Sequence, residues 1–181
     1  MKKVLIGVAV VAVVLVAGFF YLNNRNRTLS PPGKAELTSG DLTVSIPYSR
    51  PSVRGRVIFG TKEEGALQPH GEYWRLGANE STEITINRDI LFNGSPVKQG
   101  TYKMYAIPGP DEFEIRLNSE LGTWGYLEPD VEKDVLSTRV PVERLAAPVE
   151  QYTIRMEPTE SGISLIFEFA NVRFTVPLTR G

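Results

Sequence analysis

The sequence contains no cysteine and a single histidine, His70, among its 181 residues. Without cysteine there are no disulfides, no thiolate metal ligands, no cysteine nucleophile and no lipid attached to a cysteine. Zinc and copper sites usually recruit two or three imidazoles or thiolates, which one histidine does not supply. No Walker loop, dinucleotide-binding glycine fingerprint or haem-attachment motif is present either. We therefore expect neither a metal nor a cofactor.

The sequence also lacks an excess of basic residues. Lysine and arginine number 20 against 21 acidic residues, and the formal net charge is -1. Because nucleic-acid-binding domains carry a basic excess or a basic stripe, we expect no nucleic-acid partner. The hydrophobic share of 41% is typical of a chain that folds around a packed core.

A long apolar run opens the chain. Residues 4–22 carry no charge, and a helix of that length reaches about 28 Å, close to the hydrocarbon thickness of a bilayer. A cleaved signal peptide is the alternative, but cleavage after Ala17 would leave an apolar terminus, Gly18–Leu22. We predict an uncleaved transmembrane helix over 4–22, a cytoplasmic tail over 1–3, a polar linker over 23–40 and one extracytoplasmic domain over 41–181. The numbers of positive charges before and after the apolar run are nearly equal, so charge alone does not set the orientation. Because a short tail before a signal-like segment usually stays in the cytoplasm, we expect the N-terminus there.

One face of this helix carries small residues. Gly7 and Gly18 are 11 residues apart, about three turns, with Val11 and Val14 between them on the same face. Small residues allow a neighbouring transmembrane helix to approach closely, so this face is a candidate helix-packing interface. The alternative is that the pattern only reflects a valine- and alanine-rich anchor.

The remainder of the chain has the two-residue periodicity of strands. Leu42, Val44 and Ile46 alternate with polar neighbours, and further strand-like runs follow at 82–86, 101–107, 112–118, 135–142, 151–156, 163–169 and 172–176. Turn sequences such as Asn93-Gly94 and Ala170-Asn171 separate them, and no soluble helical pattern intervenes. We predict an all-β domain, an antiparallel β-sandwich or flattened barrel of about eight to ten strands.

Two segments are less well explained by this periodicity. They are Ser49-Arg50-Pro51-Ser52-Val53-Arg54-Gly55-Arg56 and Trp74-Arg75-Leu76-Gly77-Ala78-Asn79-Glu80-Ser81-Thr82. Through these segments the chain resembles the bacterial domain-of-unknown-function family 2911, and the likeness continues through Gly100-Thr101-Tyr102 and Trp124-Gly125. The resemblance implies a β-rich domain of the bacterial envelope, with no established activity or cofactor. With the anchor, it places the protein in the inner membrane and its domain in the periplasm. The chain departs from the family in having His70 where a tyrosine is common.

The same segments hold the candidate ligand-binding residues: Arg54, Arg56, Trp74, Arg75, Asn79 and Glu80. Their guanidinium groups could bind an anionic or carbonyl-bearing ligand through paired hydrogen bonds, and the indole could offer a stacking surface. We favour a structural interpretation of the segment, in which Arg75 pairs with Glu80, Asn79 caps a turn and Trp74 fills the core.

No catalytic set accompanies these residues. His70 lies between Pro69 and Gly71 in a turn-like sequence, and no Gly-x-Ser-x-Gly elbow is present. Glu128, Asp130, Glu132 and Asp134 alternate in an acidic stretch without the spacing of a calcium-binding EF-hand loop. We therefore expect a non-catalytic accessory subunit of an integral membrane complex (respiratory, photosynthetic, transport or secretion), whose helix contacts the lipid bilayer and integral membrane proteins. The alternatives are a tethered module that binds a small ligand or glycan, and an uncharacterised hydrolase.

Overall fold

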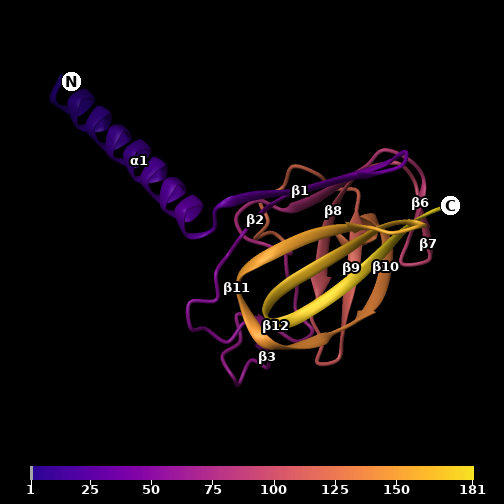
Figure 1. Ribbon diagram of the computed structural model, residues 1–181. Helices are drawn as coiled ribbons and strands as arrows, with labels where there is room; N and C mark the ends of the chain where they lie inside the picture. Colours follow the sequence, from indigo (N-terminus) through magenta and orange to yellow (C-terminus); the bar gives the residue numbers. More distant parts are fainter. Residues whose placement is uncertain (1) are drawn as a thin grey trace.

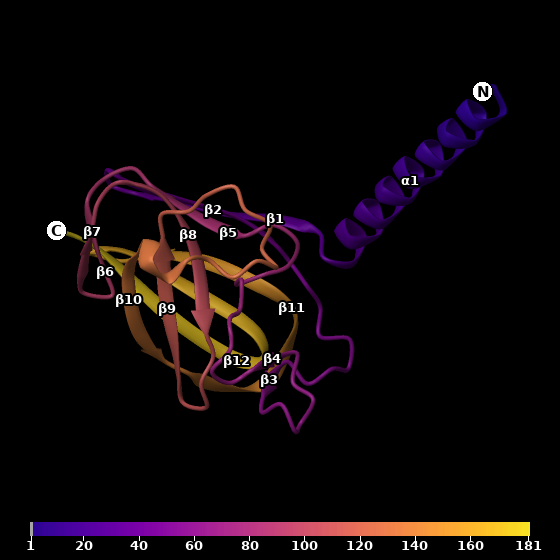
Figure 2. The ribbon, with the colours of Figure 1, turned by 180° about the vertical axis from the view of Figure 1, so that it is seen from behind.

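The computed structural model describes residues 2–181, and it divides them into one long helix and a β domain. Helix α1 spans Lys2–Leu29 and projects away from the domain, with the N-terminus at its far end (Figure 1). The C-terminus lies at the opposite end of the domain from α1 (Figures 1 and 2).

Two antiparallel sheets form the domain, which confirms the predicted β-sandwich preceded by one helix. The six-stranded sheet has the order β1-β2-β5-β8-β9-β10, with bounds Pro32–Ser39, Leu42–Ser49, Thr82–Ile86, Gly100–Ile107, Glu112–Asn118 and Asp134–Pro141. The four-stranded sheet has the order β11-β12-β6-β7, with bounds Glu143–Pro158, Gly162–Arg180, Ile90–Phe92 and Ser95–Val97. A short parallel pair, β3 (Phe59–Gly60) and β4 (Gln68–Pro69), lies at one end, and a 3-10 turn spans Val131–Lys133.

Alternation of apolar and polar residues places one face of each sheet in a shared core. Leu42, Val44 and Ile46 of β2 are fully buried, and the residues between them are half-buried. Leu165 and Phe167 of β12 reach the same hydrophobic cluster from the second sheet. The strands predicted at 42–46, 82–86, 101–107, 112–118, 135–142, 151–156 and 163–169 correspond to β2, β5, β8, β9, β10, β11 and β12.

The structure corrects the predicted linker over 23–40. Helix α1 continues past the apolar run to Leu29, and residues 32–39 form the edge strand β1, which pairs with β2 along its whole length. Ala35 of β1 is buried against the core. An edge strand has one partner and one open side, so a polar sequence with a single buried methyl group is sufficient to form it.

The predicted turn at Ala170-Asn171 also needs correction. Strand β12 runs through this dipeptide, where Ala170 adopts a left-handed φ of 52° and the pairing with β11 shifts register. A single left-handed residue inside a strand bends it as a bulge does, without ending it.

Candidate functional site

The Trp74–Glu80 segment forms an irregular connection ahead of β5. Leu76 and Asn79 adopt left-handed φ values of 51° and 60°, a conformation that is uncommon for residues other than glycine. At Gly77 a Cβ atom would come within 3.0 Å of the Ser49 carbonyl oxygen, which leaves room only for glycine. The Thr82 hydroxyl donates to the Leu76 carbonyl at 2.7 Å and fixes the end of the segment.

Trp74 lies in the core. Its side chain is 1% exposed, and its ring contacts those of Phe59 and Tyr152 at centroid distances of 5.0 and 5.3 Å. These edge-to-face contacts are the arrangement that aromatic rings prefer. The indole Nε1 is buried and has no hydrogen-bond acceptor within the described part of the chain.

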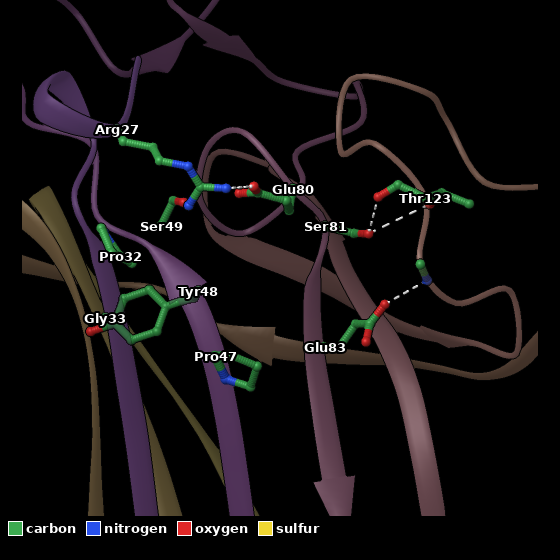
Figure 3. A pocket seen from close by; sticks show the side chains of 11 residues that line it. Arg27, Pro32, Gly33, Pro47, Tyr48, Ser49, Glu80, Ser81, Glu83 and Thr123 are labelled. Atoms are coloured by element: carbon green, nitrogen blue, oxygen red, sulfur yellow. Dashed lines mark hydrogen bonds and ion pairs between the residues drawn. The ribbon is translucent and has the colours of Figure 1, made fainter. Parts of the chain in front are cut away.

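The end of α1 is held by three of the six candidate residues. Glu80 forms an ion pair with Arg27 at 2.5 Å, Arg54 donates to the Leu29 carbonyl at 3.0 Å, and Asn79 donates to the Ser30 carbonyl at 3.4 Å. Arg27 is seen reaching toward Glu80 in Figure 3. The expected pairing of Arg75 with Glu80 is therefore wrong, because Glu80 turns toward the helix.

Arg75 lies on the other side of the segment, against the loop over residues 119–130. Its guanidinium carbon is 5.8 Å from the ring centre of Tyr126, and its Cδ lies 2.8 Å from where a Cβ atom on Gly125 would be. Among residues 2–181, no carboxylate or other hydrogen-bond acceptor contacts the guanidinium. Burial lowers the pKa of Arg75 below its ordinary value, although the residue stays charged at neutral pH.

A second cation lies beneath the same loop. Lys103 is 1% exposed, and its ammonium group donates to the Thr123 hydroxyl at 3.0 Å and to the Leu127 carbonyl at 3.3 Å. Burial lowers the pKa of Lys103, and the nearby charge of Arg75 lowers it further, while Glu120 and Glu83 oppose the change. Two cationic side chains, Arg75 and Lys103, thus lie near each other at this loop.

A cavity of about 380 Å³ opens beside Arg75, within the size range of small-ligand sites. We call it the Arg75 cavity; its wall includes Asn26 and Ser30 at the end of α1, and its remaining lining includes Arg56, Gln68, Trp74, Asn79, Trp124 and Tyr126. Arg56 uses two N–H groups to bond the Ser52 and Val53 carbonyls, at 2.6 and 3.0 Å, which leaves three of its five donors free.

A second cavity, of about 360 Å³, lies on the Glu80 side of the segment (Figure 3). Arg27 and Glu80 meet on its rim, and Tyr48 lines the strand side. Glu83 accepts a hydrogen bond from the Gly122 amide at 2.8 Å. The two carboxylates give this Glu80 cavity the opposite charge to the Arg75 cavity.

The structure thus brings Arg56, Trp74, Arg75 and Asn79 to one cavity and places Arg54 and Glu80 outside it. The sequence interpretation missed Trp124, Tyr126 and Lys103. The available signal was the pair of aromatic residues in Trp124-Gly125-Tyr126, because they stand between predicted strands and loops disproportionately carry binding residues.

The remaining acidic residues and His70 do not converge on a metal site. Asp134 accepts hydrogen bonds from Tyr105 and Asn118, and Asp130 caps the short 3-10 turn. In the region that the structure describes, no group of three histidine or acidic side chains is arranged to hold a metal ion. The His70 Nε2 is buried without a partner there.

The candidate helix-packing residues Gly7, Val11, Val14 and Gly18 all lie on the exposed surface of α1. A Cβ atom added at Gly7 or Gly18 would meet nothing within 4 Å. Helix α1 is long and apolar enough to cross a membrane, and none of its apolar stretch is buried against the domain. Because an N-terminal signal sequence has the same properties, α1 is either a membrane anchor or a signal sequence.

The family model for DUF2911, described as a protein of unknown function, matches residues 30–178. The chain belongs to the DUF2911 family. The matched DUF2911 region begins directly after α1 and contains both cavities except for the wall formed by the helix end. No curated protein and no solved structure matches the chain.

Proposed function

We propose that the protein is a non-catalytic accessory subunit of an integral membrane complex, anchored in the bacterial inner membrane by α1 with its DUF2911 domain in the periplasm. The observation that carries this proposal is that residues 4–22 are exposed along the whole helix and none of them is buried against the domain. Such a helix needs an apolar environment, which a bilayer and a neighbouring transmembrane helix supply.

The junction between helix and domain supports the same role. Helix α1 continues without interruption to Leu29, and only Ser30 and Pro31 separate it from β1. Arg54, Asn79 and Glu80 each contact the last turns of the helix. A domain held this close to its anchor keeps a fixed orientation over a partner, as a structural subunit requires, whereas a long flexible linker would not fix it.

The experiment is to enlarge the glycine face and measure recovery of the partner. Because a Cβ atom at Gly7 or Gly18 meets nothing within 4 Å among residues 2–181, leucine at both positions leaves the protein's own fold unchanged. Leucine also favours membrane insertion more than glycine does. We expect Gly7→Leu combined with Gly18→Leu to reduce co-purification of membrane proteins after mild detergent extraction, because the added bulk separates the two helix backbones.

Val13→Leu is the matched control, since residue 13 lies about a third of a turn away from the glycine face. Its partner recovery is expected to equal that of the unmodified chain at equal membrane levels. Equal recovery from all three chains would mean that the glycine face makes no contact with a partner. Release of the protein from the membrane by alkaline carbonate would instead refute the anchor.

The unpaired guanidinium of Arg75 favours a second role, in which the DUF2911 domain binds an anionic ligand. Burying part of a charge without an acceptor is costly, so such a group usually has a partner. Within residues 2–181 the exposed Arg139 has its carboxylate at 2.8 Å, while the more buried Arg75 has none. A titration of the full-length protein with inorganic phosphate tests this role, with Arg139→Gln as control.

A further inference from the structure

We propose that the Arg75 cavity binds the phosphate of an anionic phospholipid headgroup, in the leaflet that α1 crosses last. This inference rests on the proposed anchoring of α1 and specifies the ligand of the proposed anion site. Three features of the cavity carry it: its charge, its depth relative to the membrane, and the side chains around its mouth.

The charge of the cavity is positive. Arg75 has no acceptor in the described residues, and Arg56 keeps three free N–H donors beside it. Lys103 lies under the same loop, where its ammonium group donates to a hydroxyl and a carbonyl, with Glu120 and Glu83 nearby. The nearest acidic residue of the segment, Glu80, faces the other cavity and is paired with Arg27. Guanidinium groups bind phosphate oxygens through paired, charge-assisted hydrogen bonds.

The helix end sets the depth of the cavity. Asn26 lines it and lies four residues beyond Leu22, the last residue of the apolar run, which corresponds to about 6 Å along the helix axis. The polar layer of a bilayer is about 5–7 Å thick on each side of the hydrocarbon core. This wall of the cavity is therefore level with the phosphates of the lipid headgroups.

The mouth of the cavity carries the side chains that favour a membrane surface. Trp124 and Tyr126 line it and are 46% and 74% exposed, and the next residue, Leu127, is 60% exposed. Trp124 is bridged to Glu80, which in turn bonds the helix end, so these side chains are close to the point where α1 leaves the domain. Tryptophan and tyrosine concentrate at the headgroup level of bilayers. A lipid fits this mouth better than a freely diffusing phosphate does.

Native mass spectrometry of the full-length protein in detergent tests the proposal, with phosphatidylglycerol, phosphatidylcholine or inorganic phosphate as the added probe. We expect one phosphatidylglycerol to be retained in preference to phosphatidylcholine, whose choline is repelled by the arginines. Arg75→Gln should weaken retention at least tenfold, since the charged donor is lost. Arg139→Gln removes one exposed arginine elsewhere and should leave retention unchanged.

Equal retention of phosphatidylglycerol by the unmodified protein, Arg75→Gln and Arg139→Gln would overturn the site. Binding of inorganic phosphate that depends on Arg75 and displaces the lipid completely would assign the cavity to a free anion and overturn the lipid. Thermal melts of each variant establish that the fold is intact. Alkaline carbonate extraction tests the anchor separately, so failure of the anchor and failure of the lipid site give different results.

Discussion

Replacing Trp74 by alanine is expected to destabilise the protein strongly, whereas replacing Trp124 by alanine is expected to have little effect on stability. Trp74 is 1% exposed, whereas Trp124 is 46% exposed. Besides Phe59 and Tyr152, the Trp74 ring lies 6.2 Å from Phe113 and 6.4 Å from Phe174, centre to centre. Trp74→Ala therefore removes the ring around which the aromatic part of the core is packed.

The magnitude follows from the cavity that this change leaves. Large aromatic-to-alanine changes in a core cost about 3–5 kcal/mol, and each kcal/mol lowers the melting temperature of a domain this size by about 2–4 °C. We expect Trp74→Ala to lower the melting temperature by roughly 6–20 °C. Trp124→Ala removes a half-exposed side chain and should cost less than about 1 kcal/mol.

Thermal unfolding of the full-length protein in one detergent, followed by circular dichroism in the strand region, measures both variants. Because the tryptophans are the only two in the chain, the fluorescence of each variant also reports on the remaining indole. The Trp74 indole should emit as a buried group and the Trp124 indole as a partly solvated one. Equal melting temperatures for Trp74→Ala and the unmodified chain would refute the assignment of Trp74 to the core.

Two further predictions concern the edge strand β1 and the pH dependence of the stability that Glu168 contributes. A chain that begins at residue 41 lacks β1 and the buried methyl group of Ala35, so its free energy of unfolding should be at least about 2 kcal/mol lower than that of a chain that begins at residue 30. Its melting temperature should fall accordingly. Equal melting temperatures of the two chains would contradict the pairing of β1 with β2. Burial alone would raise the pKa of Glu168, but hydrogen bonds from Arg155 and Arg173 outweigh it and hold the pKa below its usual value. The stability from Glu168 is therefore present above the unfolded-state pKa of about 4.3 and is lost as the pH falls through the lower folded-state value. Glu168→Gln should lower stability by roughly 2 kcal/mol at pH 7, and denaturant unfolding from pH 7 to 3 should show this difference shrinking below about pH 4; a constant difference would contradict the role of the charge.

Periodicity predicted the strands whose faces are buried and failed where burial is slight. The alternation in β2 is unambiguous because Leu42, Val44 and Ile46 all reach the core. Strand β1 fully buries only Ala35, with Leu37 partly buried beside it, and the rest of its sequence is polar residues and a proline-glycine pair. Its structure depends on the hydrogen bonds that it makes to β2, which are contributed by the backbone and leave little trace in the sequence.

The sequence placed the end of α1 too early in the chain for a related reason. Residues 23–29 are mostly polar, and hydropathy places the end of the membrane segment at Leu22. The helix itself ends at Leu29, whose carbonyl is bonded by Arg54, 25 residues further along the chain. A contact of that kind depends on the tertiary fold, so sequence patterns near the helix do not reveal it.

The candidate site was predicted in composition but not in arrangement. The arginines, Trp74 and Asn79 were identified from one short segment, while the left-handed residues Leu76 and Asn79 decide which side of the segment each group reaches. Asparagine is enriched in the left-handed region, so the identity of Asn79 gave a weak signal, whereas the identity of Leu76 gave none. Arg75 and Glu80 consequently point into different cavities, and the expected salt bridge between them does not form.

The contacts at the helix end explain why an exposed ion pair matters here more for orientation than for stability. Arg27 and Glu80 are each nearly half exposed, and pairs of that kind contribute about 0–1 kcal/mol. Arg54 and Asn79 donate to the backbone carbonyls of Leu29 and Ser30, so the three contacts together restrict rotation of the helix about the short Ser30-Pro31 connection. Restricting that rotation keeps the Arg75 cavity and the exposed Trp124 beside the helix exit, where both the lipid headgroups and a neighbouring transmembrane subunit would meet them.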